Sequence, residues 1–178
     1  GDHAFYGCSF SDSISIPNSV TSIGSYAFAG CHELISINIP NSVTSIEYDA
    51  FSGCSSLTSI TIPNRVTDIR NNTFSGCSSL TSITIPNSVM NISSNAFSGC
   101  SSLTSLTIGN GLTTIGKSAF KYCEALPTLT IPDSVTDIAP EAFYACEKLQ
   151  VVVFNSIKAP ILEEEMEEEG IFWALILG

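Results

Sequence analysis

Positive charge is scarce in this chain. Only six of its 178 residues are lysine or arginine, against 17 aspartates and glutamates, so the formal net charge is −11. The cations are spread along the chain and form no cluster: Arg65, Arg70, Lys117, Lys121, Lys148 and Lys158. A nucleic-acid partner needs a basic patch, and an anionic membrane surface attracts polybasic segments. The composition therefore argues against both kinds of partner.

Long apolar runs and histidines are also in short supply. No apolar run approaches the roughly 18 residues of a membrane-spanning helix, so we expect no membrane insertion. A catalytic triad needs a nucleophile, a base and an orienting acid in mutual geometry, and nothing in the sequence suggests one around His3 or His32. The acidic residues do not recur as matched apolar-surrounded pairs that could serve as general acid and base. The sequence therefore predicts no catalytic residue, no cofactor and no enzymatic activity.

Cysteine and phenylalanine, by contrast, recur with a strict period of 23 residues. The cysteines are Cys8, Cys31, Cys54, Cys77, Cys100, Cys123 and Cys146, and the phenylalanines are Phe5, Phe28, Phe51, Phe74, Phe97, Phe120 and Phe143. Self-similarity at a fixed period of roughly 20–50 residues is the signature of a solenoid. Each unit is too small to bury its apolar side alone, so it stacks on its neighbours.

One repeat unit, residues 57–79, reads LTSITIPNRVTDIRNNTFSGCSS. Ile60 and Ile62 alternate with hydroxyl side chains, which is typical of a half-buried strand. Proline follows this strand in most units and ends the ladder because it has no N–H to donate. A second apolar pair, Val66 and Ile69 in this unit, predicts a second short strand or extended segment.

The segment A-F-x-G-C closes each unit, and we interpret it as a tight corner or one turn of helix. Its glycine suits a backbone position of positive φ, and it recurs as Gly30, Gly53, Gly76 and Gly99. The pattern as a whole predicts a mainly β repeat solenoid of about seven 23-residue coils. Because the chain begins in mid-repeat, we expect it to be a fragment of a longer array.

Two regions are expected along the chain. Residues 1–155 form the solenoid of seven coils, the first of them incomplete. Residues 156–178 keep the register as a degenerate C-terminal capping repeat with an acidic stretch, since a shift of 23 residues carries Ile138 to Ile161. Solenoids need an atypical polar coil at an open end. An acidic disordered tail, or an artificial extension of the chain, is the alternative for this segment.

The cysteine column has three alternative interpretations. Metal sites need ligands a few residues apart or converging from different elements, and one cysteine per coil provides neither, so no metal site is expected. Disulfides between adjacent coils would need the Cβ atoms about 1 Å closer than the spacing of stacked strands allows. We therefore expect buried free thiols that act as small apolar side chains.

The unit L-x-x-I-x-I-P-x-x-V-x-x-I-x-x-x-A-F-x-x-C closely resembles the BspA-type leucine-rich repeat, over about residues 4–155. The resemblance implies a right-handed solenoid with parallel strands. It also implies surface-exposed or secreted proteins of bacteria and some parasitic protists, although no signal sequence lies within this chain. Some members of that family act as adhesins for matrix or plasma proteins such as fibronectin and fibrinogen. The family shares no catalytic residues.

The polar positions of the first strand should form a two-column strip on one sheet face. They are Ser36, Asn38, Ser59, Thr61, Ser82, Thr84, Ser105, Thr107, Thr128 and Thr130. Three roles are open for this strip: a polar face that serves solubility, a protein-binding face, or an ice-binding array of threonines. Extended surfaces of this kind are the usual binding sites of repeat proteins.

The corner positions vary between otherwise nearly identical coils, and two of them carry Tyr26 and Tyr48. Tyrosine is favoured in interface cores, so we add both residues to the candidate protein-binding face. We therefore predict a non-catalytic cell-surface or secreted module that binds a protein ligand. An adhesin-like fragment contacting a host matrix or plasma glycoprotein is the favoured role. The alternative is a structural stalk with no ligand of its own.

Overall fold

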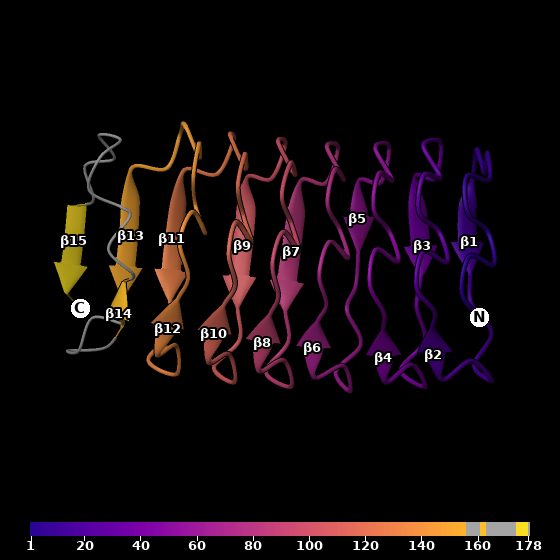
Figure 1. Cartoon of the computed structure of the whole chain (residues 1–178), viewed down its shortest axis with the longest axis horizontal. Coiled ribbons are helices and arrows are strands. Elements are labelled where there is room, and N and C mark those ends of the chain that lie inside the picture. Colours follow the sequence, from indigo (N-terminus) through magenta and orange to yellow (C-terminus); the bar gives the residue numbers. More distant parts are fainter. Residues whose placement is uncertain (156–160, 163–173, 178) are drawn as a thin grey trace.

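The computed structural model describes residues 1–155, 161–162 and 174–177 and shows a solenoid of parallel β-strands (Figure 1). The repeat makes about six complete turns between β1 and β13, one fewer than predicted, because the first of the seven expected coils is incomplete. No helix occurs in the described residues, so of the two forms expected for the corner, a tight turn or a helical turn, the structure has the tight turn. The two ends of the chain lie at opposite ends of the stack.

Each turn of the solenoid contributes two strands, which stack into two rows (Figure 1). The first row consists of β1 (Ser13–Ser15), β3 (Ser36–Asn38), β5 (Ser59–Ile60), β7 (Ser82–Ile85), β9 (Ser105–Ile108), β11 (Thr128–Ile131), β13 (Val151–Phe154) and β15 (Ala174–Leu177). The second row consists of β2 (Ser22–Ile23), β4 (Ser45–Ile46), β6 (Asp68–Ile69), β8 (Asn91–Ile92), β10 (Thr114–Ile115), β12 (Asp137–Ile138) and β14 (Ile161–Leu162).

The 23-residue period is also the register of the strands. Ile14 pairs with Ile37 in β1 and β3, and Ile92 pairs with Ile115 in β8 and β10. The same step holds for β15, where Val152 pairs with Leu175. At β14 the step is 24, because Ile138 pairs with Leu162 and not with Ile161 as the sequence predicted.

Neither row is hydrogen-bonded into one continuous sheet. The first row divides into the sheets β1-β3-β5, β7-β9 and β11-β13-β15, and the second into β2-β4 and β6-β8-β10-β12-β14. Between β9 and β11 one cause is visible. Thr81 and Thr104 donate their backbone N–H to the preceding coil, but Pro127 stands at the next equivalent position and has no N–H.

The core is a set of parallel ladders of identical side chains. Six successive ring pairs, from Phe5–Phe28 to Phe120–Phe143, stack with centroids 5.2–5.5 Å apart. Leucine, isoleucine and valine ladders fill the rest of the interior. Six of the seven cysteines are buried and Cys8 is half-buried, and all seven are free thiols, as the repeat predicted. From Cys31 onward each thiol donates to a phenylalanine carbonyl of the preceding coil at 3.0–3.4 Å.

Each corner contains two positions with a left-handed backbone. Five glycines occupy the first column, with φ between 65° and 76°, and Tyr122 and Ala145 continue it. The second column was not predicted: it holds His3, Tyr26, Asp49, Asn72, Asn95, Ser118 and Glu141, with φ between 53° and 57°. Asparagine and aspartate tolerate this conformation, but a bulky side chain is strained in it.

Candidate functional site

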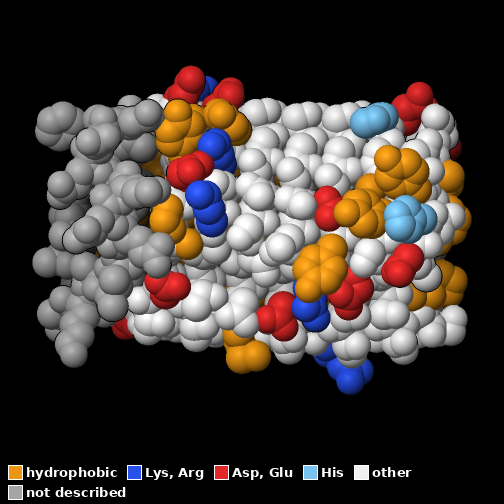
Figure 2. Space-filling model, viewed as in Figure 1, with side chains coloured by type: hydrophobic (Ala, Val, Ile, Leu, Met, Phe, Trp, Pro, Cys, Tyr) orange, Lys and Arg blue, Asp and Glu red, His pale blue; other side chains and the backbone are white. Residues whose placement is uncertain are grey.

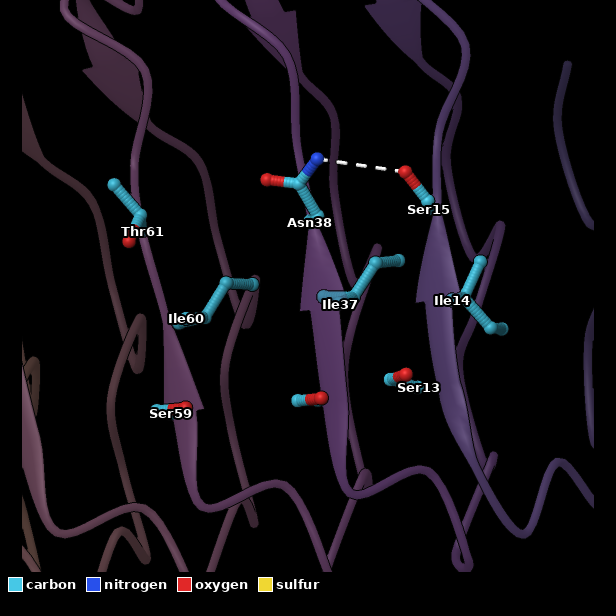
Figure 3. Close-up of a pocket in the computed structure, with 9 residues that line it drawn as sticks. Ser13, Ile14, Ser15, Ile37, Asn38, Ser59, Ile60 and Thr61 are labelled. Carbon is cyan, nitrogen blue, oxygen red and sulfur yellow. Dashed lines mark hydrogen bonds between the residues drawn. The ribbon is translucent and has the colours of Figure 1, made fainter.

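The predicted strip lies on the outer side of the first strand row. Nine of its ten serine, threonine and asparagine side chains are exposed and Ser36 is half-buried. Between its two columns the isoleucines point inward, which leaves a shallow groove along the row. Two depressions of about 320 and 340 Å³ share Ser59, Ile60 and Thr61 and make this groove continuous from β1 to β7. Figure 3 shows the part that runs over β1, β3 and β5, where Asn38 donates to Ser15 at 3.4 Å.

The strip hydroxyls differ from their threonine neighbours in their hydrogen bonds. Thr58, Thr81 and Thr104 lie one residue before the strip, and each donates its hydroxyl to a backbone carbonyl of the preceding coil at 3.1–3.4 Å. Within the described residues, the strip hydroxyls from Ser59 to Thr130 make no such internal bond. Their hydrogen-bonding capacity therefore faces solvent and is open to a partner.

A second polar ladder lies on the second strand row, and the sequence analysis did not identify it. Asn91 donates to Asp68 at 2.7 Å, and Thr114 donates to Asn91 at 2.8 Å. Burial raises the pKa of Asp68, but the hydrogen bonds from Asn91 and Thr67 outweigh it and leave the pKa lowered. Each bond spans one 23-residue step, so aligning the repeats would have placed these side chains next to one another. The ladder uses its own donors and acceptors internally and contributes to the stacking of coils.

Tyr26 and Tyr48 lie in the corner turns, on a different side of the solenoid from the strip. Together with His3, Glu47 and Arg70 they form what we call the N-terminal turn cluster. His3 stacks on Tyr26 with ring centroids 4.9 Å apart. Arg70 lies 5.5 Å from the ring centre of Tyr48 and 3.5 Å from Glu47. Both tyrosines remain exposed, at 38% and 44%.

A second group on this side, the C-terminal turn cluster, consists of Lys117, Lys121, Tyr122, Glu141 and Tyr144. Lys121 lies 2.7 Å from Glu141 and 4.6 Å from the ring centre of Tyr144, and Lys117 lies 3.5 Å from Glu141. The hydrogen bond to Glu141 raises the pKa of Lys121, and the same bond lowers the pKa of Glu141. Figure 2 shows the two clusters as separate groups of coloured side chains with a pale band between them.

The described residues do not bring metal-ligating side chains together. No three His, Cys, Asp or Glu side chains among them converge on a point that could hold a metal ion. The two depressions on the first strand row are open and shallow. A third depression, of about 260 Å³, lies over the apolar first coil. No helix in this part of the chain is long and apolar enough to cross a membrane.

The chain matches the profile of the BspA type leucine rich repeat region, with six copies, over residues 1–124 and 69–165. A comparison with curated proteins finds no match. Among solved structures, a leucine-rich repeat protein from Bacteroides ovatus is 34% identical with a TM-score of 0.82, and the match covers 90% of this chain and 40% of that protein. The Treponema pallidum leucine-rich repeat protein is 36% identical with a TM-score of 0.78, over 83% of this chain and 69% of that one.

A leucine-rich repeat protein from Eubacterium ventriosum is more distant, at 26% identity and a TM-score of 0.58. The match covers 83% of this chain and 44% of that protein, so the chain spans less than half the length of two of these three relatives. The repeat, the strand stacking and the sequence identity agree with one another, and the chain belongs to the BspA-type leucine-rich repeat family.

Proposed function

We propose that this chain is a non-catalytic protein-binding module of a cell-surface or secreted protein. Its role is adhesin-like: it contacts a host matrix or plasma glycoprotein through the strip on the first strand row. The solenoid holds the strip rigidly, and many weak hydrogen bonds along it add up to affinity. We further propose that residues 156–178 act as a capping repeat at the C-terminal end of the 1–155 solenoid.

One observation carries the proposal. The hydroxyls of Thr58, Thr81 and Thr104 are consumed by the backbone of the preceding coil, whereas their strip neighbours make no internal bond among the described residues. These donors and acceptors are not used inside the solenoid, so a partner can bond to them along two straight columns. The groove between the columns gives a partner side chain a place between the two rows of hydroxyls. Repeat proteins bind through extended surfaces of this kind.

The surface location is supported by the family and by chemistry. The resemblance to the BspA-type family implies a surface or secreted protein, and this chain belongs to that family. Free thiols are unusual outside the cell because they oxidise there. Here, burial raises the pKa of Cys54 and of Cys146 to about 12, so little thiolate is available for oxidation. The buried thiols are therefore compatible with an oxidising environment.

The experiment measures binding of the purified chain to immobilised fibronectin and fibrinogen at physiological salt. The test variant carries Thr61→Lys and Thr84→Lys, which place two bulky charges on exposed strip positions. Asp137→Lys, an exposed change on the second strand row, is the control because it raises the net charge by the same two units. Saturable binding that the strip variant loses and the control keeps supports the proposal. Absence of binding to both proteins contradicts it and favours the stalk.

A further inference from the structure

Tyr122 stands where the backbone favours glycine. Five earlier coils have glycine at this position, with φ between 65° and 76°, and Tyr122 adopts the same left-handed conformation with φ of 61°. A residue with a Cβ is strained there, and an aromatic residue more than most. Tyr122 is also 44% exposed, so it does not offset the strain by filling the core.

Tyr26 repeats this exception in the other left-handed column. Three of the six equivalent positions hold asparagine or aspartate, which tolerate positive φ, whereas Tyr26 has φ of 57°, is 38% exposed and is the bulkiest side chain of the column. Strained residues persist where the surrounding structure holds them, and they concentrate at sites of function. The two bulkiest side chains in left-handed conformation each lie in one of the two turn clusters.

The chemistry of the clusters is that of a protein interface. Tyrosine and arginine are enriched among the residues that contribute most to binding, and each cluster pairs exposed tyrosine with a cation. In the C-terminal turn cluster one carboxylate, Glu141, faces both Lys117 and Lys121, which leaves a net positive charge in an acidic chain. The side chain of Lys117 is 59% exposed and its distance to Glu141 is 3.5 Å, so it can turn to a second carboxylate.

We infer that the two turn clusters form a second docking surface, for a protein that presents a carboxylate to Lys117 and apolar side chains to Tyr26 and Tyr122. The inference rests on the proposed function and names a further contact face for the same protein partner. The strip and the turn clusters lie on different sides of the solenoid, so a partner that wraps around an edge, or two partner molecules, can contact both. The pale band of Figure 2 between the clusters contains backbone and side chains that are neither apolar nor charged, so the two tyrosine groups are separate anchors.

The test uses variants that restore the residue favoured by the repeat: Tyr26→Asn and Tyr122→Gly. Both remove strain, so we expect each to raise the thermal midpoint. Each should also weaken binding to fibronectin or fibrinogen by about tenfold, the loss typical of an interface anchor. Met90→Thr is the matched control, because it likewise replaces an exposed apolar residue with the residue usual in its column, but Met90 lies directly before β8 of the second strand row. It should leave affinity unchanged.

Lys117→Glu tests the charge of the proposed partner. It should weaken binding, and the difference from the unchanged chain should shrink at high salt because exposed charges are screened. Unchanged affinity in the combined Tyr26→Asn and Tyr122→Gly variant would overturn the second docking surface while leaving the strip in place. A lower thermal midpoint in these variants would overturn it too, since the tyrosines would then be structural. If the unchanged chain binds neither protein, the proposed function itself fails.

Discussion

The role of a single residue in this solenoid is clearest when it is compared with the residues at the same position in the other coils. The cysteine column is an example, because burial raises the pKa of every thiol in it from Cys31 to Cys146. At Cys77 and Cys100 the pKa lies well above the ordinary value. The thiols stay protonated in the folded chain at pH values where the same thiols of the unfolded chain ionise.

This difference predicts a loss of stability at alkaline pH. A thiol whose pKa is raised by folding stabilises the folded chain at pH values below its unfolded pKa of about 9. This stabilisation is lost as the pH rises from the unfolded pKa towards the folded pKa. For a thiol such as Cys54, whose pKa is raised to about 12, the free energy of unfolding should fall by about 1.4 kcal/mol per pH unit between pH 9 and that value. Urea unfolding between pH 8 and 10.5 under reducing conditions measures it. Cys77→Ala should show a shallower slope, and an unchanged slope would contradict the argument.

Two serines at equivalent positions give a matched pair. Ser88 donates its hydroxyl to the carbonyl of Val66 at 2.7 Å, whereas the hydroxyl of Ser134 is buried and has no partner in the described part of the chain. We expect Ser88→Ala to lower the free energy of unfolding by about 0.5–1.5 kcal/mol, the net value of one hydrogen bond. Ser134→Ala should be neutral or stabilising, because it removes an unpaired buried polar group. Denaturant unfolding of both variants provides the comparison, and equal losses would show that Ser134 is bonded.

Among the elements, the turn between β9 and β10 departs most from the repeat. It reads Gly109-Asn110-Gly111 where most coils have Pro-Asn-Ser or a close variant. Gly109 donates its N–H to Ile85 at 2.9 Å, which a proline could not do, and Asn110 donates to the side chain of Asn87 at 2.9 Å. The turn thus lies closer to the preceding coil than its counterparts do.

Because the turn lies so close to the preceding coil, replacing Gly111 with the serine usual at this position should destabilise the chain. A Cβ at Gly111 would collide with the backbone carbonyl oxygen of Asn87. Gly111→Ser should therefore destabilise the chain by about 1–3 kcal/mol, the usual cost of overpacking, although serine is the commonest residue at this position. Ser88→Gly makes the reverse change one coil earlier, and its difference from Ser88→Ala is the control for backbone entropy, because both variants lose the hydrogen bond to Val66. A thermal midpoint equal to or above that of the unchanged chain would contradict the predicted collision.

The elements also show how far the sequence alone could go. Ladders of one residue type, such as those that contain Phe74 and Cys77, were predictable from the sequence. The same residue type recurs every 23 positions, and 23 residues is also the length of one coil. The second left-handed column escaped notice because Tyr26, Asp49 and Asn72 share a backbone conformation but no residue type. The stacking of Arg70 on Tyr48 was equally hidden, since the two residues are 22 positions apart and their contact depends on how the corner turns.

At the scale of the whole molecule, the main interactions among the described residues connect one coil to the next. The stacked phenylalanines, the thiol hydrogen bonds and the strand register all connect residues about 23 positions apart. In such an array stability is approximately the sum of terms for each unit and for each interface between neighbours. No segment is needed to hold distant parts of the chain together, so removing a complete unit should leave the others able to stack.

Deletion of residues 93–115 tests this additivity. The cut joins Ile92 to Gly116 at equivalent positions, places Phe120 on Phe74, and keeps both turn clusters. The chain should still unfold cooperatively, and its m-value should fall by about one sixth, in proportion to the surface that one coil buries. Deletion of residues 70–92 should lower the m-value equally, because it too removes one coil and one interface. Urea unfolding of both variants measures this, and collapse of the fold in either would mean that coils depend on more than their neighbours.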